Sequence, residues 1–181
     1  MNLLRYFTTR DFVHIAAIVA AVYVLSFITK MTVGAIPFPG LKMLLDAFFA
    51  SLVISVGLMW VKKIGTFTLI GLIYGIICGF IFPGIFFMFP PVLVGGIVGD
   101  ITVKLLKGNY EVRKNVILAC SICYFVAAFV IFYVMILMDY PQAILRHEVI
   151  FGIAVGCSVL AVLGSYLGTK IAGELRRAGL M

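Results

Sequence analysis

Three ionisable side chains lie inside long apolar stretches of this chain, where a charge is costly and its presence points to function. They are His14, Asp46 and Asp100. A carboxylate or an imidazole at that depth can bind a ligand, relay a proton or hold an ion. The competing interpretation for each aspartate is local ion pairing along a helix, because Lys42 precedes Asp46 by four residues and Lys104 follows Asp100 by four.

The positions of these residues argue against catalysis. We expect Asp46 and Asp100 to lie about 15 to 20 Å apart along the membrane normal at about 1.5 Å rise per residue, too far for an aspartyl dyad. Ile97 also stands where a Gly-x-Gly-Asp protease motif needs glycine. His14 and His147 are predicted on opposite sides of the membrane, which leaves no shared metal and no Ser/His relay. Without a phosphate-binding loop, we expect no enzyme and no cofactor bound by this chain.

The connections on one side of the apolar stretches are aromatic where loops are normally polar. Residues 36–40 and 82–91 are rich in phenylalanine and proline, and residues 139–148 carry a dense polar group. Such surface either enters the lipid interface as a belt or forms the wall and lid of a pocket. For a pocket, we predict substrate contacts from Phe38, Asp46, Phe82, Phe86, Phe87, Phe89, Tyr140, Arg146 and His147. A ligand with an apolar body and an anionic or hydrogen-bonding edge would suit this set.

The elements that must position these residues are predicted to be membrane-spanning helices. Of the 181 residues, 64% are hydrophobic and 12% are charged, a balance that excludes a soluble domain of this size. Continuous apolar runs favour helices over a barrel, and they cover residues 12–29, 43–61, 64–82, 86–103, 116–138 and 151–169. The short connections between them predict a single all-α domain over residues 1–181, a six-transmembrane-helix bundle. The first span is expected to be retained rather than cleaved as a signal.

Positive charge is distributed unevenly over the connections and predicts the orientation of the chain. Eleven of the fourteen Lys and Arg residues flank the spans on the side of the two termini, and only Lys30, Lys42 and Arg146 fall on the other. Because Lys/Arg-rich loops stay inside, we predict both termini in the cytoplasm. The net charge of +7 then reflects contact with the anionic leaflet rather than with nucleic acid. This orientation puts Asp46 in the outer half of its span.

Glycines recur four residues apart in several predicted spans and indicate close helix packing, mostly within the chain. They are Gly71, Gly75 and Gly79, then Gly95 and Gly99, then Gly152, Gly156, Gly164 and Gly168. The four cysteines, Cys78, Cys120, Cys123 and Cys157, also fall inside spans, where we interpret them as packing residues rather than redox or zinc ligands.

The first span carries two overlapping pairs of alanines spaced four apart. Ala16 with Ala20, and Ala17 with Ala21, give this helix a flat face. Two interpretations stay open. The face either packs inside the bundle or docks another membrane subunit.

With these features in place, the chain resembles the substrate-binding S components of energy-coupling factor (ECF) transporters over nearly its whole length. The resemblance rests on the size, the six spans, the alanine-rich first helix and an outer connection able to cap a pocket. Residues 61–140, with Lys62-Lys63-Ile64-Gly65, the glycine-rich third span, Gly95 to Asp100 and Lys107-Gly108-Asn109-Tyr110, look like the Trep-Strep branch of that superfamily.

The resemblance implies a receptor in a prokaryotic cell membrane that captures a vitamin or other micronutrient, haem-like and siderophore-like cargo included, from outside. It implies docking through Ala16 and Ala20, or Ala17 and Ala21, on a scaffold transmembrane subunit that carries two ATPases, so that the partners use the ATP. The alternative is a stand-alone secondary transporter or membrane assembly factor in which Asp46 and Asp100 couple ions.

Overall fold

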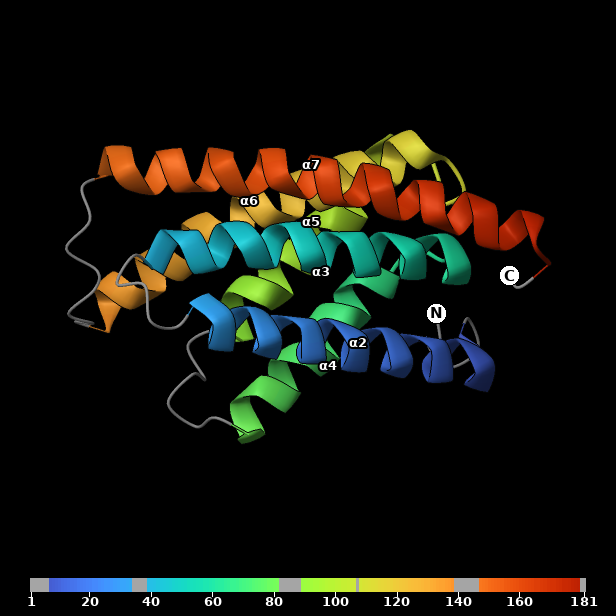
Figure 1. Ribbon diagram of the computed structural model, residues 1–181, viewed down its shortest axis with the longest axis horizontal. Coiled ribbons are helices and arrows are strands. Elements are labelled where there is room, and N and C mark those ends of the chain that lie inside the picture. Colours follow the sequence, from blue (N-terminus) through green and yellow to red (C-terminus); the bar gives the residue numbers. More distant parts are fainter. Residues whose placement is uncertain (1–6, 34–38, 82–88, 107, 139–146, 180–181) are drawn as a thin grey trace.

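The protein is all-helical, as the sequence predicts. The computed structural model describes residues 7–33, 39–81, 89–106, 108–138 and 147–179. Six helices cover most of these residues (Figure 1): α2 Thr9–Val33, α3 Pro39–Val61, α4 Thr66–Ile81, α5 Phe89–Leu105, α6 Arg113–Leu137 and α7 His147–Arg177. Each of the six predicted spans coincides with one of these helices.

The helices fall into two length classes. Four of the described helices, α2, α3, α6 and α7, are long and apolar enough to cross a membrane, which is compatible with a multi-pass membrane location. Helices α4 and α5 have 16 and 17 residues. At about 1.5 Å per residue they extend about 24 to 26 Å, less than a hydrocarbon core of about 30 Å. Figure 1 shows both of them inclined to the four long helices, with which they form one bundle.

Glycines set how closely the helices approach one another. A Cβ on Gly164 would overlap the carbonyl oxygen of Phe48, and one on Gly168 would overlap that of Leu52, so α7 lies directly on the backbone of α3. Between α4 and α5, a Cβ on Gly71 would meet the carbonyl oxygen of Val92 at 2.8 Å. Most of the glycine stripes therefore pack within the chain, while Gly152 has nothing within 4 Å of its Cβ position.

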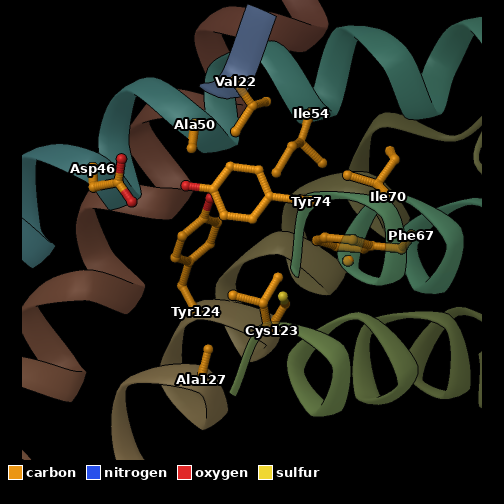
Figure 2. Close-up of a pocket in the computed structure, with 12 residues that line it drawn as sticks. Val22, Asp46, Ala50, Ile54, Phe67, Ile70, Tyr74, Cys123, Tyr124 and Ala127 are labelled. Carbon is orange, nitrogen blue, oxygen red and sulfur yellow. The ribbon is translucent and has the colours of Figure 1, made fainter. Parts of the chain in front are cut away.

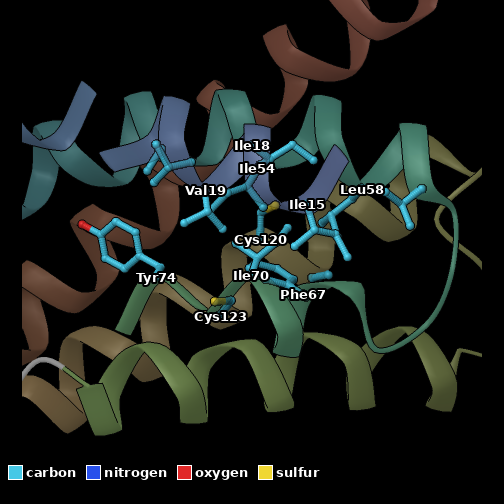
Figure 3. Packing of buried hydrophobic residues seen from close by; sticks show 14 of the residues in the cluster. Ile15, Ile18, Val19, Ile54, Leu58, Phe67, Ile70, Tyr74, Cys120 and Cys123 are labelled. Carbon is cyan, nitrogen blue, oxygen red and sulfur yellow. The ribbon is translucent and has the colours of Figure 1, made fainter. Parts of the chain in front are cut away.

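The main core lies where α2, α3, α4 and α6 meet. Figure 3 shows Ile15 and Val19 of α2 packed toward Leu58 of α3 and Phe67 of α4. The cysteines Cys78, Cys120, Cys123 and Cys157 are all buried and unbridged, as expected of packing residues.

Polar contacts close one end of the bundle. Thr8 and Asp11 cap the start of α2 reciprocally, since the Thr8 N–H donates to Asp11 at 2.7 Å and the Asp11 N–H donates to the Thr8 hydroxyl at 3.4 Å. Lys63, between α3 and α4, pairs with Asp11 at 2.6 Å. The start of α2 and the end of α7 both lie at this end of the bundle (Figure 1).

Candidate functional site

A cavity of about 70 Å³ lies in the middle of the bundle, between five helices. Its wall is mostly apolar and is made by Val22, Ala50, Ile54, Phe67, Ile70, Gly71, Val92, Cys123 and Ala127, with Asp46, Tyr74 and Tyr124 as the polar residues (Figure 2). An apolar cavity with a few convergent polar groups is the usual form of a small-molecule site.

The polar groups of this cavity gather at one side. Figure 2 shows the phenolic oxygens of Tyr74 and Tyr124 close together and directed toward the side on which Asp46 lies. The Ser26 hydroxyl, on α2, donates a hydrogen bond to Oδ1 of Asp46, on α3. Tyr74, on α4, lies near both Ser26 and Asp46. Three helices therefore bring hydroxyl groups into the surroundings of one half-buried carboxylate.

This arrangement suits a ligand of mixed polarity. Phe67, Ile70 and Ile54 offer apolar surface for the body of a ligand, while Tyr74 and Tyr124 offer hydroxyls that both donate and accept hydrogen bonds. The volume of about 70 Å³ is well below the roughly 300 Å³ of a typical small-molecule site. A vitamin-sized ligand thus requires the helices around the cavity to separate.

The predicted substrate contacts are distributed unevenly with respect to this cavity. Asp46 lies on its wall. Phe89 begins α5 and packs against α4, where its ring would meet a Cβ on Gly75 at 2.6 Å. His147 is exposed at the start of α7, with its ring 6.4 Å from that of Tyr133. Neither Phe89 nor His147 lines the cavity. The remaining predicted contacts, Phe38, Phe82, Phe86, Phe87, Tyr140 and Arg146, lie outside the described residues.

Sequence reasoning missed Tyr74, Tyr124 and Ser26. A signal was available, because a phenol in the middle of an apolar span must find a partner for its hydroxyl or lose free energy. Tyr74 is 7% exposed and stands in the glycine-rich helix α4. What the sequence could not supply was the packing that brings it to Ser26 and Asp46, 48 and 28 residues earlier in the chain.

Asp100 belongs to a different arrangement. It is 6% exposed and accepts hydrogen bonds from the Gly65 N–H at 3.0 Å, the Thr68 N–H at 2.7 Å and the Thr68 hydroxyl at 2.6 Å. The Tyr110 hydroxyl donates a fourth at 2.5 Å. The sequence offered Lys104 as a local partner, but among the described residues these four donors come from elsewhere. Asp100 caps α4 and ties α5 to it, where the negative carboxylate also suits the positive end of the helix dipole.

The four alanines of α2 do not pack inside the bundle. Ala16, Ala17, Ala20 and Ala21 are all exposed. The same face continues through Val13, which is 63% exposed, and Val24, which is 54% exposed. The opposite face carries Ile15, Val19 and other core residues. The four alanines therefore lie on the surface of the described bundle rather than in its interior.

His14 is half-buried and its ring lies 4.9 Å from that of Trp60, a packing contact at the capped end of the bundle. In the part of the chain that the structure describes, no three His, Cys, Asp or Glu side chains are grouped to hold a metal ion. Comparison of the chain with protein-family models, with curated proteins and with solved structures found no match.

Proposed function

We propose that this chain is the membrane-embedded substrate-binding subunit, or S component, of an ECF-type ABC importer. In this proposal it spans the membrane six times with both termini in the cytoplasm. It captures a vitamin or another micronutrient from outside and docks on a scaffold transmembrane subunit. Two ATPases on that scaffold use the ATP.

The observation that carries the proposal is the exposed alanine face of α2. Small side chains on a lipid-facing helix give up contact area with lipid, but they allow a second helix to approach its backbone closely. Ala16, Ala17, Ala20 and Ala21 make this surface over more than one helical turn, and none of the described helices covers it. A scaffold helix is the occupant that an S component needs there.

The cavity supplies the second half of the argument. A receptor subunit needs a ligand site within its own helices, and in this proposal the cavity beside Asp46, Tyr74 and Tyr124 serves as that site once its helices separate. Val22 of α2 lines the cavity from the side of the helix opposite to the alanines. One helix therefore joins the ligand site to the proposed docking face.

Affinity purification tests the docking step. The wild-type chain, expressed with its own cell's transport machinery, should retain a scaffold subunit and two ATPases. The double substitution Ala16→Trp and Ala20→Trp should abolish this association, because two indoles hold the scaffold helix away. Val159→Trp is the matched control, since Val159 is 55% exposed on α7, away from the alanines. Equal recovery of partners with the double variant and with the control would overturn the docking assignment.

The alternative function is a stand-alone secondary transporter coupled to ions through Asp46 and Asp100. These two aspartates differ in their surroundings. Asp46 stands beside a cavity, as ion coupling would need. Asp100 is held by four hydrogen bonds as a structural cap, which favours a role in packing. Proton uptake by vesicles that contain the purified chain alone would support the alternative, and its dependence on Asp46 would locate the coupling site.

A further inference from the structure

A second, smaller cavity lies at the capped end of the bundle, far along α3 from Asp46. It has a volume of about 50 Å³ and is lined by Met59, Trp60, Lys62, Glu111, Ala172 and Arg176. These residues come from the end of α3, the segment before α6 and the last turns of α7. The cavity is thus formed where three chain segments leave the apolar part of the bundle.

The charges of this cavity are predominantly positive. Lys62 and Arg176 contribute two cations and Glu111 one carboxylate, whose distance from the Lys62 ammonium is 3.8 Å. That contact is loose, and the two side chains are 38% and 52% exposed. Arg113 adds a third cation nearby, because its guanidinium lies against α7, 2.5 Å from where a Cβ on Gly173 would stand. The cavity can therefore accept an anion.

Trp60 gives this cavity an apolar wall that faces outward. It is the only tryptophan of the chain and is 36% exposed, and its ring lies 4.9 Å from the His14 ring at a tilt of 33°. Tryptophan favours the level of lipid headgroups, where its ring contacts acyl chains and its N–H meets polar groups. Trp60, which lines the cavity and is also exposed, is thus placed to contact both the cavity and a surrounding lipid.

The backbone at Lys62 is held in an unusual conformation. Lys62 follows the last residue of α3 and has φ 60°, a left-handed region that costs a lysine roughly 1 to 2 kcal/mol relative to a right-handed one. Glycine is the residue that normally ends a helix in this way. Lys62 therefore places a cation beside the cavity at a backbone cost that glycine would not have.

We propose that this cavity binds the phosphate headgroup of an anionic phospholipid, with Lys62 and Arg176 on the phosphate and Trp60 against the upper part of an acyl chain. A lipid is favoured over a soluble anion because half of the lining is apolar and the cavity lies at the end of membrane-long helices. The inference does not rest on the transport function proposed above. A lipid site at the capped end of the bundle would stand whichever small molecule, if any, the protein transports.

The single tryptophan allows a direct test. The purified full-length chain is placed in vesicles that mix phosphatidylglycerol with phosphatidylcholine, and one of the two lipids carries brominated acyl chains that quench Trp60 fluorescence on contact. The ratio of quenching with brominated phosphatidylglycerol to quenching with brominated phosphatidylcholine measures lipid preference at this one residue. The wild type should prefer phosphatidylglycerol.

Charge variants give the expected pattern. Lys62→Gln and Arg176→Gln should each lower the preference by up to about fivefold, the effect of about one unit charge near a membrane surface. Glu111→Gln should raise it, because it removes the competing carboxylate. Arg177→Gln changes the net charge equally but removes a side chain that pairs with Glu174 at 2.9 Å outside the cavity, and it should leave the preference unchanged.

Three results would overturn the assignment. One is equal quenching of the wild type by the two brominated lipids. Another is a loss of preference in Arg177→Gln as large as in Lys62→Gln and Arg176→Gln, which would mean general surface charge. The third is a preference that millimolar inorganic phosphate abolishes, which would make the site one for a soluble anion.

Discussion

The Tyr110 hydroxyl donates a 2.5 Å hydrogen bond to Oδ1 of Asp100, and the two residues are 0% and 6% exposed. The bond joins the segment before α6 to α5, and Asp100 in turn holds the first residues of α4. The start of α4 and the end of α5 are thereby fixed together at the capped end of the bundle.

Asp100→Asn should destabilise the protein by about 3 kcal/mol, because hydrogen bonds to a charged acceptor contribute about 1.5 to 3 kcal/mol each and the new amide would face its former donors. Tyr110→Phe keeps the ring and should cost about half as much. Thermal unfolding in detergent measures both. Lys104→Gln is the control for local ion pairing. If it lowers the melting temperature as much as Asp100→Asn does, the proposed role of Asp100 as a cap fails.

Gly168→Ala should lower stability by about 1 to 3 kcal/mol, since its methyl group would overlap the Leu52 carbonyl oxygen and push α7 from α3. Gly152→Ala, in the same helix, meets nothing within 4 Å and should be neutral or stabilising by up to about 1 kcal/mol through helix propensity. The two variants are compared by thermal unfolding of the detergent-solubilised protein. Equal behaviour would mean that α7 does not lie on the α3 backbone.

Lys62→Gly should raise stability by about 1 kcal/mol, because glycine adopts the left-handed conformation of φ 60° without steric cost. Lys63→Gly should act in the opposite direction, since it removes the 2.6 Å ion pair with Asp11. Melting temperatures of the two variants, recorded together, check the signs. A loss of stability with Lys62→Gly would show that its side chain contributes more than its backbone costs.

Much of the fold could be predicted from the sequence, because a continuous apolar run long enough to span lipid is also a helix with all its backbone bonds satisfied. The ends were less well predicted. Hydropathy stops at Thr169, but α7 continues through Lys170 to Arg177, since a helix that leaves the apolar core still keeps its backbone bonds.

The candidate site was harder to predict from the sequence, because it depends on how helices distant in the chain pack together. Asp46 could be singled out because a carboxylate in an apolar span is costly wherever it packs. Tyr74 and Tyr124 also stand in apolar spans, but only the packing of three helices shows that their hydroxyls lie on the same side of the cavity as Asp46. For Asp100 the sequence suggested a partner in Lys104, four residues away. Its hydrogen-bond donors in the structure lie up to 35 residues away.

The central claim, capture of a small molecule in the cavity beside Asp46, is tested most directly by native mass spectrometry of the protein purified from its own membrane. We expect the wild type to carry a small-molecule adduct that Asp46→Asn and Tyr124→Phe lose, while Lys104→Gln, an exposed change far from the cavity, retains it. An adduct held equally by all four proteins, or only phospholipid masses on the wild type, would contradict the account.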